Sequence, residues 1–190
     1  MKSERGPRGH NNIHMAVVTT PEQFMHALAV RAICFLEQGN ATYQQAIDGN
    51  DYQATHIVAY AGAEPIGATR IRWFRDFAKI ERTAFRPDYR SVRILKLCSD
   101  FIFSHVARKG YDVLITHAEP NFARVWEMVL GFERSAARSE VTYDDREPLI
   151  ELVKRLKPVD DAVTAASDPK MLFRIEGYWD KPHAFETCDA

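Results

Sequence analysis

Hydrophobic positions in the first part of the chain follow two different periods. Residues 15–18 form a short apolar run that is typical of a strand. Thr20 followed by Pro21 is typical of a helix start, because proline fits the first helical turn. Apolar residues then recur at helical spacing up to Leu36. We therefore expect a strand from residue 15 and a helix over residues 21–36, followed by a shorter helix or loop over 42–49.

A β-hairpin is the clearest local prediction. Residues 56–60 and 65–73 are β-like runs, and the Ala-Gly-Ala-Glu segment between them has the length and glycine content of a hairpin turn. A third β-like run, 78–85, ends before Pro87, because proline cannot donate to the ladder of a central strand. The pattern therefore predicts two or three antiparallel strands.

Helices and strands alternate in the next part of the chain. Residues 91–109 have apolar side chains at helical spacing, and Gly110 is a typical helix stop. Residues 112–118 have a continuous apolar centre, which is typical of a strand covered on both faces. A further helix is expected over residues 121–130, ended by Gly131.

The pattern after residue 132 is less regular. Residues 146–156 have helical spacing, residues 158–169 resemble a linker, and residues 171–177 are expected to form a final strand. Aromatic and apolar residues in this extension could instead form a homodimer arm or a lid. The order of elements favours an α/β domain with a mixed sheet flanked by helices.

Domain boundaries follow from the same pattern. Residues 1–14 are polar and aperiodic, so we expect a disordered leader. Residues 15–133 are expected to form the main domain, and residues 134–190 an extension packed on that domain. A chain of 190 residues with 46% hydrophobic and 27% charged residues is ordinary for a globular protein with a sizeable core.

Charge and cysteine content exclude several function classes. The net charge of −1 gives no electrostatic reason to expect nucleic acid or an anionic membrane as a partner. We expect a cytoplasmic protein, because no apolar run approaches a membrane span and the N-terminus lacks a signal-peptide core. Cys34, Cys98 and Cys188 lack the spacing of a metal site or redox pair, and the first two are expected to be buried thiols.

Four cations surround the expected helix start at Ser91. Exposed backbone N–H groups at a helix N-terminus attract anions. Arginine and lysine side chains nearby would pair well with a pyrophosphate or a phosphopantetheine group. A solvated basic helix start explains the same residues equally well. The four cations are Arg86, Arg90, Arg93 and Lys96.

The chain also resembles the GNAT superfamily of N-acyltransferases over about residues 16–133. Residues 81–90 resemble its fourth strand and the loop that leads to the cofactor-binding turn, and Asn121 to Phe132 resembles its later helix. The resemblance implies a mostly antiparallel GNAT-type sheet. It also implies transfer of an acyl group, in particular acetyl, from acetyl-CoA or another acyl-CoA to the amine of a small molecule by direct attack, without a metal.

The turn that binds the cofactor in this superfamily is glycine-rich, but no glycine occurs between Arg90 and Leu95. Glycine lets a backbone approach a phosphate closely. Either arginine side chains hold the phosphates in a rearranged turn, or the cofactor site is lost and the chain is an inactive binding module. The resemblance assigns the cofactor to Ala84, Phe85, Arg90, Ser91, Val92, Arg93, Ile94, Leu95, Asn121 and Trp126.

The first half is also similar to autoinducer synthases and N-acyl amino acid synthases, which share the fold and use acyl-carrier protein or acyl-CoA. Tyr43 stands where those enzymes often have tryptophan, and Lys79 stands where they have a glutamate. This similarity keeps acyl-carrier protein open as the donor. The residues that carry it are Arg31, Phe35, Asp51, Gly67, Arg70 and Arg82.

Direct transfer needs a base for the amine. Glu81 is the first candidate, since its strand flanks the thioester in GNAT folds, and His117 is the second. A structural ion pair of Glu81 with Arg70 or Arg82 is the alternative.

Trp126 replaces the tyrosine that protonates the leaving thiolate in the family. Arg31, Arg70 and Arg82 could bind an acceptor carboxylate, which would suit an amino acid, with Phe35 also on the substrate side; salt bridges explain the arginines equally well.

Overall fold

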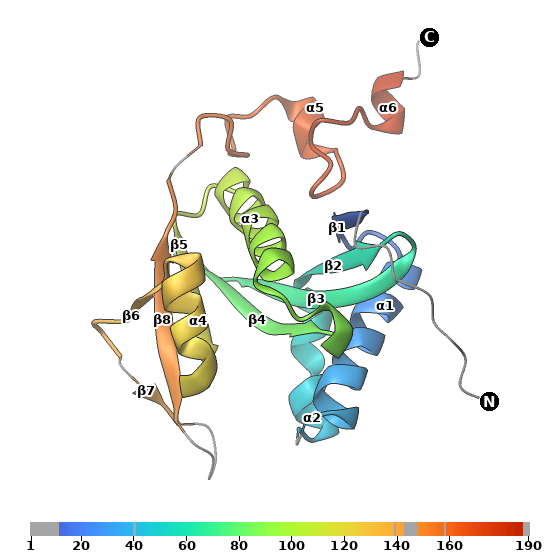
Figure 1. Ribbon diagram of the computed structural model, residues 1–190. Helices are drawn as coiled ribbons and strands as arrows, with labels where there is room; N and C mark the ends of the chain where they lie inside the picture. Colours follow the sequence, from blue (N-terminus) through green and yellow to red (C-terminus); the bar gives the residue numbers. More distant parts are fainter. Residues whose placement is uncertain (1–11, 40, 139, 143–147, 158, 188–190) are drawn as a thin grey trace, which may run out of the picture.

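A computed structural model describes residues 12–187 apart from residues 40, 139, 143–147 and 158. Within these residues the chain forms one eight-stranded sheet with helices on both faces (Figure 1). The sequence places residues 1–14 in a leader, but the first strand already begins at Ile13; residues 1–11 lie outside the described part.

The strands and helices are close to the expected positions over most of the chain. The strands are β1 (Ile13–Val17), β2 (Thr55–Ala61), β3 (Glu64–Trp73), β4 (Ala78–Phe85), β5 (Val113–Ala118), β6 (Glu133–Arg134), β7 (Glu140–Val141) and β8 (Leu149–Arg155). The helices are α1 (Pro21–Arg31), α2 (Tyr43–Ala46), α3 (Val92–Arg108), α4 (Pro120–Leu130), α5 (Pro169–Leu172) and α6 (Ala184–Thr187), with a π-helical turn η1 (Ala32–Glu37) and 3₁₀ turns η2 (Gly49–Gln53) and η3 (Pro87–Tyr89).

The sheet is mixed and mostly antiparallel, as the sequence predicts. Its strand order is β1-β2-β3-β4-β5-β8-β6, with β7 also paired to β8. The strands β1 to β4 are antiparallel neighbours, β4 and β5 are parallel, and β8 is antiparallel to β5. The predicted hairpin of β2 and β3 is confirmed; Gly62 in its turn has a φ of 63°, which favours glycine.

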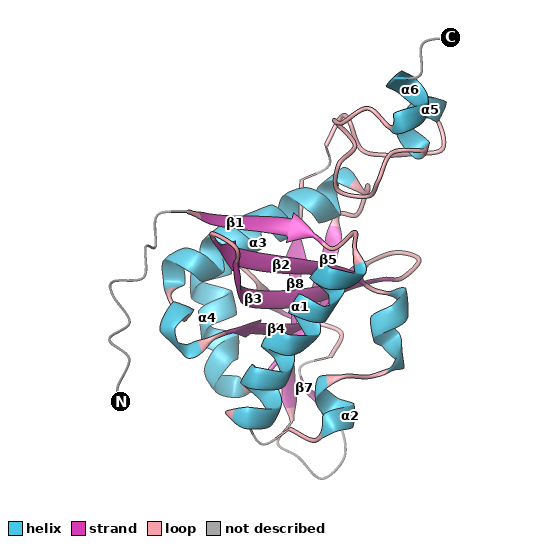
Figure 2. Ribbon diagram, turned by 90° about the vertical axis from the view of Figure 1, so that its right-hand side faces the viewer, coloured by secondary structure: helices cyan, strands magenta, loops and turns pink. Residues whose placement is uncertain are grey.

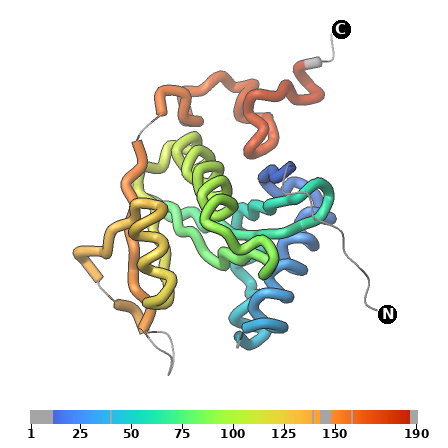
Figure 3. Tube along the Cα trace, in the orientation of Figure 1, coloured from blue at the N-terminus to red at the C-terminus, as the bar shows by residue number. Residues whose placement is uncertain are grey.

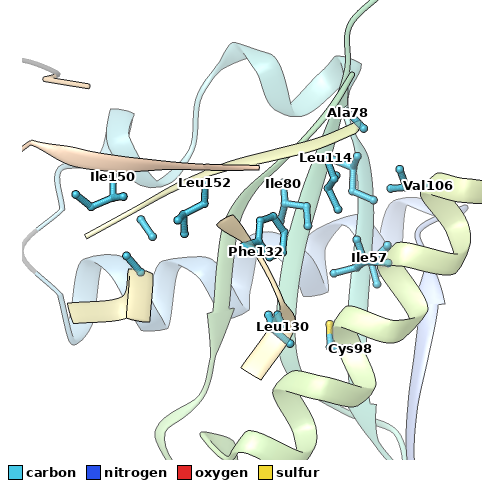
Figure 4. Packing of buried hydrophobic residues seen from close by; sticks show 14 of the residues in the cluster. Ile57, Ala78, Ile80, Cys98, Val106, Leu114, Leu130, Phe132, Ile150 and Leu152 are labelled. Carbon is cyan, nitrogen blue, oxygen red and sulfur yellow. The ribbon is translucent and has the colours of Figure 1, made fainter. Parts of the chain in front are cut away.

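Helices cover the two faces of the sheet separately. Figures 1 and 2 show α1 and α2 on one face and α3 and α4 on the other. On the second face, Ile57, Ile80 and Leu114 of three strands share one apolar cluster with Cys98 and Val106 of α3 (Figure 4). The helix ends also follow the sequence, because α4 ends at Gly131 in the left-handed conformation and Gly110 follows α3 with a φ of 85°.

Strands β4 and β5 separate halfway along their length. Their register pairs Ala78, Lys79 and Ile80 with residues 114–116, and the pairing ends at Ile80 and Thr116. Both strands continue beyond this point, with Glu81 as the next residue of β4 and His117 as the next residue of β5. Beyond Ile80, the edge of β4 that faces β5 has no described strand partner, so its backbone is open to an extended ligand.

A bulge distorts β4 next to the separation. Arg70 pairs with Glu81 and Ala68 with Ala84, so Arg82 and Thr83 together stand opposite a single residue of β3. Arg82 has a φ of 55°, a left-handed conformation that costs a non-glycine residue about 1–3 kcal/mol. Bulges of this kind redirect side chains; here the bulge puts Arg82 on the same face as Arg70, against Asp48.

Three expectations about the second half are wrong. The residues expected in a helix over 146–156 form β8, apart from residues 146–147, which lie outside the described part. Ile150 and Leu152 are buried on the α4 side with Glu151 between them, so the period is two rather than 3.6.

The second error concerns β5, which was expected to be covered on both faces. Leu114 is buried whereas Ile115 is half-buried, so the strand is not fully covered on both faces.

The third error concerns residues 171–177, which do not complete the sheet. They form the end of α5 and following turns, with Asp168 capping the helix by accepting from the Lys170 N–H at 2.9 Å. Figure 3 shows this C-terminal segment over the end of α3. Glu176 fixes it there by contacts with Thr55 at 2.8 Å and with His105 and Lys109 at 3.1 Å each.

The two described cysteines are buried, as expected. Burial raises the pKa of the Cys98 thiol to about 12, so this thiol stays protonated and packs as a small apolar group. Cys188 lies outside the described residues.

Candidate functional site

A buried network of ion pairs lies on the α1 face of the sheet. Its centre is Asp51, which accepts from Arg31 Nη1 at 2.5 Å and from Arg70 Nη1 at 2.8 Å. All three residues are 3% exposed or less. Burial raises the pKa of Asp51, but hydrogen bonds from Arg31 and Arg70 outweigh it, so the pKa is lowered and the carboxylate is ionised.

Arg70 is saturated by protein carboxylates. Besides Asp51 it donates to Asp48 from Nη1 at 2.7 Å and from Nη2 at 3.0 Å, and to Glu81 Oε2 from Nη2 at 2.7 Å and from Nε at 3.0 Å. Arg31 is fully buried and holds Asp51 and the backbone oxygen of Ala46. The expectation that Arg31 and Arg70 bind an acceptor carboxylate is therefore corrected: these guanidinium groups are enclosed and hold the α1–α2 region against the sheet.

The outer rim of the network is positively charged. Lys79 Nζ lies 2.8 Å and Arg72 Nη1 3.8 Å from Glu81 Oε1, and Arg82 Nη2 lies 3.2 Å from Asp48. The Arg72 and Arg82 side chains are 31% and 32% exposed. Among the described residues, the connected network contains the five cations Arg31, Arg70, Arg72, Lys79 and Arg82 and only the three carboxylates Asp48, Asp51 and Glu81. Two positive charges are in excess.

Glu81 is tightly paired within this network. Burial raises the pKa of its carboxyl group, but contacts with Lys79 and Arg70 outweigh burial and lower it. A carboxylate whose charge is matched by two cations has a weak tendency to accept a proton. These contacts support the ion-pair alternative for Glu81 over a role as base.

His117 forms a second, separate pair with Glu151. The two residues stand directly opposite in the antiparallel register of β5 and β8, and His117 Nε2 lies 3.0 Å from Glu151 Oε2. The His117 and Glu151 side chains are only 12% and 9% exposed. Burial lowers the pKa of His117 more than the contact with Glu151 raises it, so the imidazole is neutral at pH 7.

Glu81 and His117 flank the point where β4 and β5 separate. Lys79 of β4 is level with Ile115 of β5, so Glu81 and His117 lie on the same face, two residues further along each strand. The charges of Lys79 and Glu81 both act on the His117 ring. This opening therefore brings together both base candidates from the sequence.

The expected anion site at the start of α3 is assembled in part. Ser91 caps the helix by accepting from the Ile94 N–H at 3.3 Å. Arg90 donates from Nε to the Phe85 oxygen at 2.9 Å and from Nη2 to Gln38 at 3.1 Å, whereas Arg93 is exposed. Ile94 is buried with Ile66 and Tyr89, so only its backbone faces the turn.

The remaining cofactor positions lie at the opened end of β4, in helix α4 and in the first turn of α3. Ala84 is buried against α1, and Phe85 packs over Gly67, where an added Cβ would overlap the phenyl ring. Asn121 is exposed in the first turn of α4. Trp126 is half-buried and meets Phe132 edge-on with ring centroids 5.2 Å apart. The others are exposed Val92 and half-buried Leu95, both in the first turn of α3.

Phe35 packs with Val30 and Cys34 in the apolar cluster beneath α1. Sequence reasoning missed Asp48 and Glu151. Asp48 precedes Asp51 by one turn, a spacing that would put both carboxylates on one side of η2. Glu151 was missed because its segment was interpreted as a helix, whereas the alternation Ile-Glu-Leu indicates a strand with an inward carboxylate.

Within the described part of the chain, no helix is long and apolar enough to cross a membrane. Nor do three His, Cys, Asp or Glu side chains gather there in a way that would hold a metal ion.

Comparison with known proteins adds an independent line of evidence. No family model matches the chain. It is 31% identical over 103 residues to the uncharacterized N-acetyltransferase YjcF of Bacillus subtilis, a match that spans 54% of this chain and 74% of that protein. It is also 26% identical over 121 residues to a protein of the same organism that is named putative acetyltransferase BSU40680, and this match spans 62% of this chain and 82% of the relative.

Solved structures resemble the fold. An acyl-CoA N-acyltransferase from Pseudomonas aeruginosa superposes with a TM-score of 0.64 at 15% identity, covering 75% of this chain and 99% of that one. FeeM, an N-acyl amino acid synthase from uncultured soil microbes, superposes with a TM-score of 0.63 at 13% identity, covering 76% of this chain and 91% of FeeM. At these identities the structures show a shared fold alone.

Proposed function

This chain belongs to the GNAT superfamily of N-acyltransferases, and on that premise we propose that it transfers an acyl group, in particular acetyl, from a CoA thioester to the amine of a small molecule. The observation that carries the proposal is the opening between β4 and β5, with ionisable side chains of both strands directly beyond Ile80 and Thr116. An extended pantetheine arm can lie along the edge of β4 as an added strand would.

The donor is held at the start of α3. The helix N-terminus and the side chains of Arg90 and Arg93 supply positive potential for the phosphates. Arg90 already binds the Phe85 oxygen, so its guanidinium lies beside the opened end of β4. This arrangement supports the view that arginine side chains replace the missing glycines.

His117 is the base in this proposal. The amine nitrogen attacks the thioester carbonyl carbon, the carbon–sulfur bond breaks, and the proton lost by the amine passes to the neutral imidazole. Glu81 is a weaker candidate, because Lys79 and Arg70 already hold its charge. Trp126 cannot protonate the leaving thiolate, so that proton comes from the imidazolium or from solvent.

The charge of the outer rim favours an acceptor with an anionic group. Arg82 and Arg72 are each about one-third exposed, and the network has positive charge in excess. An amine that carries a carboxylate would offset part of this excess, and Arg82, whose Nη2 lies 3.2 Å from Asp48, is a partly exposed guanidinium that could bind it. The name of FeeM, an N-acyl amino acid synthase, is consistent with such an acceptor.

Acyl-carrier protein is the second candidate donor. Arg93 and Lys96 are exposed on the first turns of α3, which would suit an acidic carrier protein as well as a nucleotide phosphate. The two donors predict different partners for the same basic surface.

An activity assay with matched donors and acceptors tests the proposal. The purified protein is supplied with acetyl-CoA, octanoyl-CoA or octanoyl acyl-carrier protein, and with amino acids or the corresponding amines that lack the carboxylate. Released thiol is measured. We expect turnover with a CoA donor and a preference for the carboxylate-bearing acceptor. Turnover only with the carrier protein would identify the second candidate, and no turnover with any donor would contradict both in favour of an inactive binding module.

A further inference from the structure

We propose that Glu151 is the positioning residue for His117, holding the imidazole in the tautomer that accepts the proton of the amine. The inference rests on the proposed function. Its structural part, the choice of tautomer, can be measured without any turnover.

The strand pairing fixes the geometry of the pair. His117 and Glu151 are register partners, and β8 is held on one side by β5 and on the other by β6. The backbone oxygen of Glu151 accepts from the Ser135 N–H at 3.0 Å, which ties this position to the segment after β6. A carboxylate on a strand bonded at both edges is a rigid partner for a histidine.

The chemistry of the contact determines where the proton resides. An ionised carboxylate can only accept hydrogen bonds, so the His117 nitrogen 3.0 Å from Glu151 carries the hydrogen. In a neutral imidazole this leaves the lone pair on Nδ1. Glu151 is ionised: burial raises the pKa of its carboxyl group, but the hydrogen bonds from His117 and Ser135 and the charge of Arg138 together outweigh burial and lower it.

Burial keeps the His117 ring neutral until it takes the proton. Burial lowers the pKa of His117 and Lys79 lowers it further, whereas Glu151 and Glu81 raise it. Arg138 acts on Glu151 from the segment before β7. When Nδ1 takes a proton from the amine, the new imidazolium lies against the Glu151 carboxylate, which stabilises the charge formed during the reaction. Glu81 does not stabilise a proton in the same way, since its carboxylate contacts Arg70 and Lys79, two cations that repel an incoming proton.

The substitution Glu151→Gln separates positioning from simple packing. Glutamine has nearly the same shape, but its amide N–H₂ can donate to Nε2, so the imidazole is expected to move its hydrogen to Nδ1 and lose its lone pair there. Glu151→Asp keeps the acceptor and should keep the tautomer. Glu133→Gln is the matched control, because Glu133 is exposed on β6 and pairs with the same strand as Glu151.

Two readouts test the proposal. Nitrogen NMR of histidine-labelled protein, with the His117 signals assigned from a His117→Asn variant, should show Nε2–H in the wild type and in Glu151→Asp, and Nδ1–H in Glu151→Gln. In the acyl-transfer assay, kcat of Glu151→Gln should fall about 100-fold with little change in donor KM, in line with the loss of a general base. The acid limb of its pH profile should move to lower pH, because the imidazole loses an anionic neighbour.

The outcomes are distinct. A wild-type Nδ1–H tautomer, or the same tautomer and kcat in wild type and Glu151→Gln, would overturn the inference. If Glu151→Gln fails to fold, the Nε2–H tautomer in wild type and Glu151→Asp still supports it, and an Nδ1–H form in either overturns it. The expected tautomers without turnover in any variant would leave the pair intact and refute the proposed function instead.

Discussion

Arg70 donates two hydrogen bonds to Glu81 Oε2, from Nη2 at 2.7 Å and from Nε at 3.0 Å. The same guanidinium also binds Asp48 and Asp51, so β3, β4 and the loop around η2 meet at one buried cation. Hydrogen-bonding and ion-pairing groups of the protein surround Arg70, which gives Glu81 the character of a counter-ion.

The first prediction concerns that role of Glu81. Glu81→Gln should lower the free energy of unfolding by about 1–3 kcal/mol, because it weakens the hydrogen bonds to a buried cation. Its kcat should fall by less than about tenfold, below the effect of a lost general base. Chemical denaturation and steady-state kinetics measure the two quantities. A large loss of kcat with unchanged stability would instead make Glu81 the base.

Asp51 provides a second prediction about the same network. Asp51→Ala leaves Arg31 and Arg70 buried without their shared partner, so the free energy of unfolding should fall by about 3–5 kcal/mol. Asp76→Asn is the control, because Asp76 and its partner Arg75 are 81% and 94% exposed and such pairs contribute about 1 kcal/mol or less. If urea denaturation gave equal losses in the free energy of unfolding for the two variants, the buried network would contribute no more to stability than an exposed ion pair.

The contacts of Glu176 that attach the C-terminal segment to the domain should depend on pH. Burial raises the pKa of its carboxyl group, but contacts with His105 and Thr55 outweigh this and lower the pKa from 4.5 to about 2. A group whose pKa is lowered by folding stabilises the fold above its unfolded pKa and loses that effect as the pH falls through the folded value.

The stabilising effect of Glu176 should therefore be complete above about pH 4.5 and disappear towards about pH 2. The Glu176→Gln variant should be less stable than wild type at pH 7, and the difference should vanish at the acid end. Unfolding is measured from pH 7 to 2, with Glu140→Gln on exposed β7 as the control. If the difference in the free energy of unfolding between wild type and Glu176→Gln stayed constant with pH, an ionised Glu176 would not be what stabilises the C-terminal segment.

Gly67 tests the packing at the opened end of β4. A methyl group at this position would overlap the Phe85 ring, so Gly67→Ala should cost about 1–3 kcal/mol and displace the strand end that flanks the donor. Gly49→Ala is the control, since nothing lies within 4 Å of an added Cβ there. Donor affinity and thermal stability should both fall in the first variant alone; equal behaviour of the two would contradict the close approach.

Local patterns were sufficient to predict the hairpin and the helix ends at Gly110 and Gly131, because each depends on neighbouring residues, and the order of strands and helices was sufficient to predict a mixed sheet. The interpretation of β8 as a helix failed because the apolar residues of 146–156 also fit a helical spacing, whereas the alternation that marks the strand is short, with Ile150 and Leu152 on either side of the buried carboxylate of Glu151. Its true partner is His117, a residue distant in the sequence, so only the sheet register reveals the pair.

The arginines are a second case in which the sequence alone does not show which side chains are buried and paired. The sequence identified Arg31, Arg70 and Arg82 as a set, but it could not say which of them are enclosed. The structure buries the first two against Asp51 and leaves Arg82 32% exposed on a strained bulge. Burial and pairing over long sequence distances decide which guanidinium groups remain available to a substrate.

Donor binding is tested most directly by a calorimetric titration of the protein with acetyl-CoA and octanoyl-CoA. The titration compares the wild type, the paired variant Arg90→Ala with Arg93→Ala, and Arg75→Ala as an exposed control. We expect one donor per chain and about tenfold or more weaker binding in the paired variant alone, since each charged hydrogen bond contributes about 1.5–3 kcal/mol. No binding of either thioester to the wild type would contradict a CoA-dependent acyltransferase.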